Sequence, residues 1–142
     1  MTSYFAYGAN MDPVHMAACC PQATRLGLAV LSGRCFRIAA TGFGDAPLVA
    51  GGQLHGVLWR LSASDEAALD AFEGVPEGLY CKEHAEVRDE AGRPVSAMLY
   101  RAADPAAGRP APGYLERVIE VGESLGFPSG YLQGLRNQLT AG

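Results

Sequence analysis

Glycine and proline set the strongest limit on what this chain can fold into. The sequence of 142 residues contains 18 glycines and 9 prolines, spread along its whole length. Both residues interrupt regular structure, because glycine adopts backbone conformations that other residues avoid and proline lacks an N–H donor. This spacing predicts many short strands joined by tight turns, and it argues against a bundle of long helices.

Six stretches have the composition or the alternation of β-strands. They are expected at about 4–7, 25–31, 35–40, 53–61, 81–88 and 95–100. In the fourth stretch Val57, Trp59 and Leu61 share one face, as a period of two requires. The polar segment 89–94 separates the last two stretches and predicts a hairpin. The longest irregular segment is expected at 41–52.

Three helices are expected, at 63–73, 112–125 and 129–139. Ser62 is a suitable N-cap for the first, acidic residues follow it in the first turn, and Gly74 is suited to end the helix. Strands outnumber helices, and the regular strand–helix–strand alternation of a parallel sheet is missing. We therefore expect a single domain over residues 1–142, of the α+β class, with a curled or closed sheet and a few peripheral helices.

Charge and apolar patterning exclude several classes of function. The formal net charge of −4 gives no basic footprint for nucleic acid. The sequence has no apolar run of membrane-spanning length and no pattern of a secretory signal. The four cysteines lack metal-ligand or CxxC spacing, and we expect reduced thiols in a cytoplasmic protein; they are Cys19, Cys20, Cys35 and Cys81.

Glu73 is unusual because it ends the helix predicted over 63–73, directly before Gly74. A carboxylate at a helix C-terminus is unfavourable by roughly 0.3–1 kcal/mol, since that end carries partial negative charge. If the side chain is buried, desolvation raises its pKa further and suits it to move a proton near neutral pH. The alternative is a solvated glutamate at a frayed helix end.

Other polar residues give weaker indications. His15, His55 and His84 show no metal-ligand spacing, so no metal site is expected. A cysteine and a histidine could still meet in space as a nucleophilic pair, although free cysteine is more often a small core residue. Tyr80 and Tyr114 are compatible with simple packing.

The stretch TSYFAYGANMDP at residues 2–13 runs from a strand directly into a loop with almost no side chains. Its Tyr7-Gly8-Ala9-Asn10-Met11 resembles the YGSN-type loop of the gamma-glutamylcyclotransferase-like family. The later run GVLWRLSASDEAALDAFEGVPEGLY, at residues 56–80, is similar to a second signature of that family. It includes Leu69-Asp70 and Glu73-Gly74-Val75. Pro110 to Tyr114 and the C-terminal helix also fit, so the resemblance spans essentially the whole chain.

The resemblance implies a small β-barrel-like fold, mixed or antiparallel, and a site for each matching residue. Residues 7–11 imply a cradle of backbone N–H groups for the substrate, and small residues allow such close approach. Glu73 is implied as the acid/base, with hydroxyls supplied by Tyr80 and Tyr114. Ala9 departs from the serine of many members, which removes a hydroxyl contact but leaves the backbone amide.

The implied activity is cyclisation of a γ-glutamyl amide to 5-oxoproline with release of the free amine. This acyltransferase- or lyase-type amide cleavage needs no cofactor or metal, because the attacking α-amine belongs to the substrate. The expected partner is therefore a small γ-glutamyl molecule, and the oligomeric state is not encoded in any pattern. Two alternatives remain open: a carboxylate-binding module on the same fold and a Cys/His hydrolase.

Overall fold

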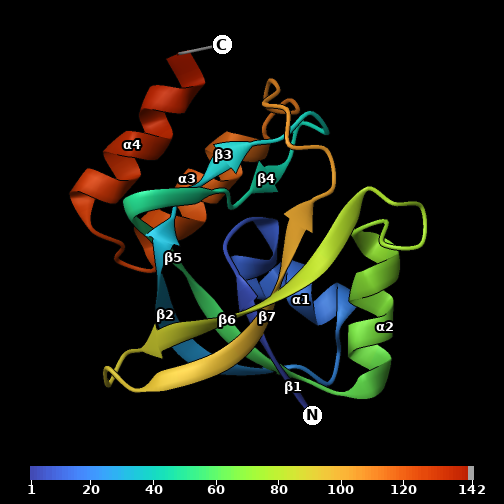
Figure 1. The fold of residues 1–142 in the computed structure, drawn as a ribbon. Coiled ribbons are helices and arrows are strands. Elements are labelled where there is room, and N and C mark those ends of the chain that lie inside the picture. Colours follow the sequence, from blue (N-terminus) through green and yellow to red (C-terminus); the bar gives the residue numbers. More distant parts are fainter. Residues whose placement is uncertain (141–142) are drawn as a thin grey trace.

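The computed structural model describes residues 1–140 and has a closed five-stranded barrel at its centre (Figure 1). The order of strands around the barrel is β1-β5-β2-β6-β7. Neighbouring strands are antiparallel except β1 and β7, which pair in parallel through Tyr4 and Met98 and close the sheet. The barrel strands are β1 (Thr2–Ala6), β2 (Thr24–Arg34), β5 (Leu48–Leu61), β6 (Tyr80–Asp89) and β7 (Pro94–Ala102). The predicted α+β class and closed sheet are confirmed.

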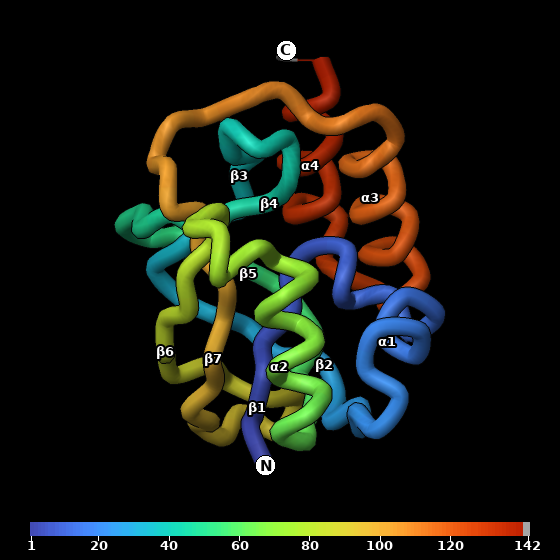
Figure 2. The backbone as a smooth tube through the Cα atoms, turned by 90° about the vertical axis from the view of Figure 1, so that its right-hand side faces the viewer, coloured from blue at the N-terminus to red at the C-terminus, as the bar shows by residue number. Residues whose placement is uncertain are grey.

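A small hairpin and the helices surround this barrel (Figures 1 and 2). The hairpin consists of β3 (Arg37–Ile38) and β4 (Gly44–Asp45), which form a separate two-stranded sheet. The helices are the 3₁₀ turn η1 (Ala9–Met11), α1 (Pro13–Cys19), α2 (Ala63–Phe72), α3 (Tyr114–Ser124) and α4 (Ser129–Thr140). Helices α3 and α4 pack on each other, while α2 contacts α1 and β5, and its Glu66 bonds to Thr2 of β1 and Lys82 of β6. None of the helices in the described part of the chain is long and apolar enough to cross a membrane.

Local sequence explains the end of α2, where Glu73 lies. The helix begins as predicted, since the Ser62 side chain accepts the N–H of Asp65 at 3.2 Å. At its end Gly74 takes a positive φ of 69°. The N–H of Gly74 then bonds to Ala71 O at 3.2 Å and that of Val75 to Asp70 O at 3.0 Å. This is a Schellman motif, and it fixes Glu73 as the C-cap.

The core fills the barrel and the space under the helices. Its largest fully buried side chains are Phe5, Met11, Met16, Leu54, Leu61, Leu69, Met98, Leu99, Leu115, Val57, Val87 and Val118. Val57, Trp59 and Leu61 are all buried, as the alternation predicted. In α3 the predicted stripe is present, with Leu115, Val118 and Ile119 facing the core.

Three segments differ from the sequence-based expectation. Of the strand expected at 35–40 only β3, Arg37–Ile38, is present. Strand β5 begins at Leu48 rather than at residue 53, and Gly44–Asp45 form a strand, so 41–52 is not irregular throughout. The segment is rich in glycine, which is rare in strands, so the sequence did not indicate these pairings. Helix α1 was not predicted, although Asp12 caps it by accepting the N–H of Val14 at 3.0 Å and Pro13 occupies the first turn. The sequence Asp-Pro was the available signal.

Gly56 is required where β1 and β5 meet, and its substitution gives a testable stability effect. A β-carbon there would lie 2.3 Å from the carbonyl oxygen of Ala6 and 2.8 Å from ring carbons of Phe5. Because backbone cannot yield as a flexible side chain can, we expect Gly56→Ala to lower the free energy of unfolding by about 1–3 kcal/mol. Gly134→Ala in α4 is the control, since no atom lies within 4 Å of its added carbon. Urea unfolding measures both, and equal midpoints would contradict the expectation.

Candidate functional site

A single cavity of about 520 Å³ collects residues from six separate segments. They come from β1 with the loop after it, the β3–β4 hairpin, the end of α2, the start of β6 with the turn before it, β7, and the start of α3. The lining residues are Tyr4, Tyr7, Gly8, Ala9, Asn10, Thr41, Phe43, Gly44, Phe72, Glu73, Leu79, Tyr80, Tyr100 and Tyr114. Its volume is typical of a site for a small organic molecule.

Glu73 faces the loop after β1 across the cavity. Asn10 donates its Nδ2–H groups to Glu73 Oε1 at 3.1 Å and to the Tyr4 hydroxyl oxygen at 2.8 Å. The loop is held by the 3₁₀ turn, in which the N–H of Met11 and the N–H of Asp12 bond to the carbonyls of Gly8 and Ala9, both at 3.1 Å. The carboxyl group therefore has a fixed neutral donor beside it rather than a cation.

Burial gives this carboxyl group an unusual acidity. Desolvation raises the pKa of Glu73 to about 7, and the hydrogen bond from Asn10 only partly opposes the rise. A carboxyl group with such a pKa exists in both protonation states near neutral pH, which general acid–base catalysis requires. The solvated, frayed helix end considered above does not describe Glu73.

The Asn10 side chain has unused hydrogen-bonding capacity. The residue is buried, and its Oδ1 atom has no partner within the described structure. A buried acceptor without a donor is unfavourable, typically by about 1–3 kcal/mol. Since Asn10 lines the cavity, a donor group on a bound molecule can satisfy this oxygen.

Two tyrosines hold the hairpin against the barrel. The Tyr80 hydroxyl donates to Gly44 O at 2.9 Å and lies 3.0 Å from Thr41 Oγ1. The Tyr114 hydroxyl accepts the N–H of Gly44 at 3.1 Å. Burial raises the pKa of both phenols, so both remain protonated at neutral pH.

The position of the Tyr114 hydroxyl also explains why two residues of the site are glycines. A β-carbon at Gly8 would lie 2.5 Å from the Tyr114 hydroxyl, and one at Gly44 would lie 2.9 Å from the same atom. This oxygen therefore sits between the loop after β1 and the hairpin, in space that only glycine leaves open.

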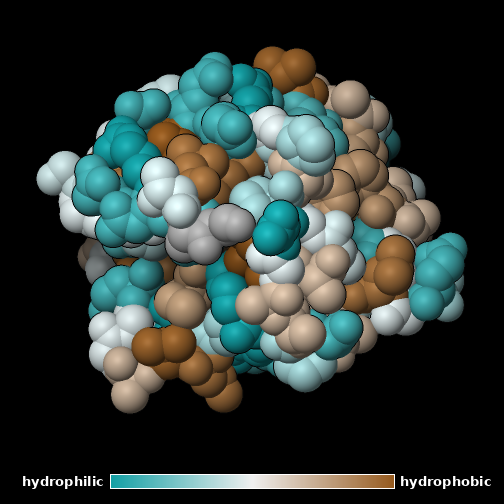
Figure 3. All heavy atoms as spheres, turned by 90° about the horizontal axis from the view of Figure 1, so that it is seen from above, coloured by the Kyte–Doolittle hydropathy of each residue, from teal (hydrophilic) through white to brown (hydrophobic). Residues whose placement is uncertain are grey.

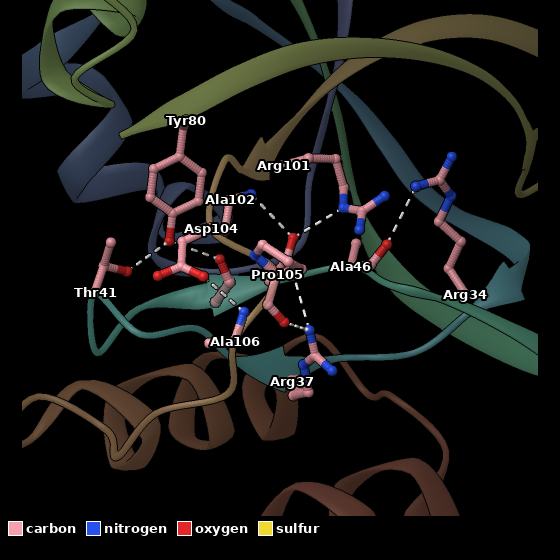
Figure 4. Close-up of polar contacts among 12 residues, drawn as sticks. Arg34, Arg37, Thr41, Ala46, Tyr80, Arg101, Ala102, Asp104, Pro105 and Ala106 are labelled. Atoms are coloured by element: carbon pink, nitrogen blue, oxygen red, sulfur yellow. Dashed lines mark hydrogen bonds and ion pairs between the residues drawn. The ribbon is translucent and has the colours of Figure 1, made fainter. Parts of the chain in front are cut away.

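Hydrogen bonds and an ion pair fix the hairpin that forms one wall of the cavity (Figure 4). Asp45 is completely buried and accepts Arg101 Nε at 2.8 Å and the N–H of Ala102 at 3.0 Å. Arg34 donates to Ala46 O at 3.2 Å, and Arg37 donates to Pro105 O at 2.6 Å. These bonds tie the hairpin to β7, β2 and the loop that follows β7.

The structure brings most of the residues singled out in the sequence into this cavity. Tyr7, Gly8, Ala9, Asn10, Glu73, Tyr80 and Tyr114 all line it. Met11 does not, because its side chain is buried in the core at 2% exposure. The lining residues that sequence reasoning missed are Tyr4, Thr41, Phe43, Gly44, Phe72, Leu79 and Tyr100. Phe72 and Leu79 lie within the signature run 56–80. Thr41, Phe43 and Gly44 lie in the glycine-rich segment 41–52, whose composition suggests a pocket-shaping loop but singles out none of them.

No cysteine or histidine lines the cavity in the described chain. Burial raises the pKa of the Cys20 and Cys35 thiols, which opposes formation of a nucleophilic thiolate. His15 instead packs edge-on against Phe72, with ring centroids 5.0 Å apart. Residues 1–140 also contain no cluster of metal-ligating side chains. The Cys/His alternative therefore has no geometric support.

The raised pKa of Glu73 predicts a gain in stability on substitution. Between pH 4.5 and about 7 the folded chain keeps a proton that the unfolded chain has lost, so unfolding becomes easier as pH rises. Glutamine does not titrate. We expect Glu73→Gln to be more stable than the wild type at pH 8 by about 1–3 kcal/mol, with little difference at pH 4.5. Urea unfolding at both pH values tests this, with Glu77→Gln as the exposed control; a pH-independent difference would contradict it.

Comparison with known proteins gives consistent relatives. The model of the AIG2-like family matches residues 53–135. The chain is 25% identical to gamma-glutamylcyclotransferase of Mus musculus, over 94% of this chain and 76% of the relative. It is 24% identical to the protein of the same name from Homo sapiens, with the same coverage.

Solved structures share the fold. One described as gamma-glutamyl cyclotransferase superimposes with a TM-score of 0.86 at 22% identity, covering 95% of this chain and 86% of the other. YkqA from Bacillus subtilis gives a TM-score of 0.80 at 24% identity, covering 98% of this chain and 54% of the other. At these identities the superpositions establish the barrel architecture.

Proposed function

The chain belongs to the AIG2-like, gamma-glutamylcyclotransferase-like family, and from that premise we propose that it is an enzyme that cyclises γ-glutamyl amides to 5-oxoproline. The observation that carries the proposal is Glu73, a cavity-lining carboxyl group with a pKa raised to about 7. It faces the loop Tyr7–Asn10 that the family resemblance marks as the substrate cradle.

In the proposed reaction, ionised Glu73 binds the α-ammonium group of the substrate and takes one of its protons. The resulting amine attacks the γ-carbonyl carbon, so a new carbon–nitrogen bond closes a five-membered ring. Protonated Glu73 returns its proton to the leaving nitrogen as the original amide bond breaks. The remaining surplus proton on the ring nitrogen passes to solvent, and 5-oxoproline and the free amine are the products.

The surrounding residues take the other roles in the proposal. Backbone N–H groups near Gly8 and Asn10 stabilise the negative oxygen of the tetrahedral intermediate, since the first N–H groups of a helical turn have no partner inside it. The Asn10 Oδ1 atom, which lacks a donor in the described structure, accepts an N–H group of the substrate. Tyr80 and Tyr114, both protonated, hold the hairpin wall against the substrate.

A pair of substrates tests this function. Cyclisation requires a free α-amine, so a γ-glutamyl amide should be consumed and its N-acetylated counterpart should remain intact. Consumption of both at similar rates would indicate a hydrolase instead. Iodoacetamide treatment should leave the activity unchanged, because no cysteine lines the described cavity.

The binding-module alternative makes a different prediction for the same samples. A ligand that raises the melting temperature of the wild type without any turnover would favour it over an enzyme.

A further inference from the structure

Three large apolar side chains lie at the solvent-exposed edge of the cavity, its mouth, away from the polar groups of Asn10 and Glu73. Phe43, Phe72 and Leu79 all line the cavity, yet they are 47%, 56% and 53% exposed. They come from three separate segments, the β3–β4 turn, the end of α2 and the turn before β6. Seen from above, the surface carries separate hydrophobic patches between hydrophilic areas (Figure 3). Three large apolar side chains converging on one opening need an explanation that folding does not supply.

The aromatic rings of Phe43 and Phe72 are held in place by neighbouring rings. Phe43 packs edge-on against Tyr114, with centroids 5.1 Å apart, and Phe72 packs against His15 at 5.0 Å. Leu79 lies against Gly74, where an added β-carbon would approach its Cδ1 atom to 2.8 Å. The apolar mouth is therefore built from positioned side chains, and it adjoins the catalytic glutamate because Phe72 and Gly74 flank Glu73 in sequence.

The charge of the cavity limits what can bind at this mouth. Glu73 is the only charged side chain among the lining residues, and no lysine, arginine or histidine is among them. Every γ-glutamyl substrate has one α-carboxylate and one α-ammonium group, and an amino acid as leaving group adds a second carboxylate for which the lining offers no cation. Desolvating an unpaired charge beside a like charge is costly, whereas an apolar group gains from contact with exposed rings.

We propose that the leaving group of the substrate is an uncharged, apolar amine, of the arylalkyl or branched alkyl class, seated against Phe43, Phe72 and Leu79. This inference rests on the proposed cyclotransferase function and specifies its substrate. The γ-glutamyl part lies near the polar groups of Asn10 and Glu73, and the amide nitrogen lies between these groups and the apolar side chains. The remaining volume of the 520 Å³ cavity accommodates the amine.

Arg109 offers the competing arrangement. Its backbone packs against Gly42, where an added β-carbon would lie 3.3 Å from the Arg109 carbonyl oxygen, and Phe43 follows directly. The Arg109 side chain is exposed and does not line the cavity. If it swings over the mouth, substrates with a carboxylate in the leaving group are preferred.

Three substrates with the same γ-glutamyl group separate these possibilities: the phenethylamide, the ethylamide and γ-glutamylphenylalanine. The phenethylamide and γ-glutamylphenylalanine differ only by the carboxylate, and the two amides differ only by the ring. We expect kcat/KM for the phenethylamide to exceed that of each of the others by at least about tenfold. Release of 5-oxoproline is the readout.

Variants locate the preference at the mouth. Phe43→Ser and Leu79→Ser are expected to lower the ratio of kcat/KM for the phenethylamide to that for the ethylamide about tenfold. Leu48→Ser is the matched control, because Leu48 is 75% exposed and lies outside the cavity. It should leave this ratio unchanged.

The outcomes distinguish the two levels of the proposal. Equal turnover of all three substrates, or a preference for γ-glutamylphenylalanine that Arg109→Ala abolishes, would overturn the apolar leaving group and leave the cyclotransferase intact. Absence of 5-oxoproline with every substrate would overturn the cyclotransferase and the specificity together.

Discussion

Replacing Glu73 with glutamine is expected to lower kcat for 5-oxoproline release by at least about 10²-fold, the lower end of general acid–base contributions. Glutamine keeps the volume and can still accept the Asn10 Nδ2–H bond seen at 3.1 Å. It cannot accept or return a proton. Steady-state kinetics on a γ-glutamyl amide measures the effect, and a residual rate is expected from orientation within the intact cavity.

The control for this substitution is Glu77→Gln. Glu77 is exposed in the turn after α2 and does not line the cavity, so its neutralisation tests the general effect of removing a carboxylate nearby. Unfolding curves must show that both variants are folded. Near-normal turnover of folded Glu73→Gln would remove Glu73 from the mechanism.

The wild-type pH profile provides a second check on the same residue. The proposed reaction begins with ionised Glu73, whose pKa is raised to about 7 by burial. The rate constant kcat/KM should therefore fall as pH decreases through about 7, with a slope of one on a logarithmic plot. A profile that is flat down to pH 5 would indicate an ordinary, solvated carboxyl group.

Asp45→Ala is expected to produce the largest loss of stability, about 3 kcal/mol in the free energy of unfolding. Asp45 is completely buried, and its Oδ1 accepts both Arg101 Nε at 2.8 Å and the N–H of Ala102 at 3.0 Å. Alanine leaves the Arg101 charge largely buried, with Glu83 as a longer contact at 3.4 Å. It also frees the hairpin wall of the cavity, so KM should rise as well.

A surface pair is the comparison for Asp45. The Arg93 side chain is 77% exposed and contacts Asp89 at 3.3 Å, so Arg93→Ala should cost less than about 1 kcal/mol. Asp45→Asn keeps an acceptor for the N–H of Ala102 and should fall between the two. Denaturant unfolding of the three variants gives the order directly, and a loss below that of Arg93→Ala would show that the buried pair does not fasten the hairpin.

The local sequence was sufficient to predict the helix ends and strand faces, because interactions between residues close in sequence determine them. Ser62 and Gly74 mark the ends of α2, and that alone places Glu73 at a helix C-terminus. The alternation of Val57, Trp59 and Leu61 identifies one buried face of β5. It did not show that Leu54 and Leu58 on the opposite face are buried as well. The opening loop required the family resemblance to be read as a binding element.

The rest of the site depends on closure of the barrel and could not be read from short segments. Thr41 and Gly44 meet Tyr80 only because Asp45 and Arg101 draw the hairpin onto β7. Pairing of Tyr4 with Met98 in turn brings β1 beside β7 and places Tyr100 near Tyr4. Met11 shows the reverse case, since a position within the loop motif lies in the core rather than in the cavity.

Incorporation of oxygen from water into the products tests most directly the central claim, that the α-amine of the substrate and not water attacks the γ-carbonyl. In oxygen-18 water, cyclisation of a γ-glutamyl amide by the wild type should give unlabelled 5-oxoproline and free amine in equal amounts, because the α-amine rather than water attacks the carbonyl. Mass spectrometry of the products measures this. Labelled glutamate would show that water is the nucleophile, and it would contradict the cyclotransferase mechanism even if Glu73 proved essential.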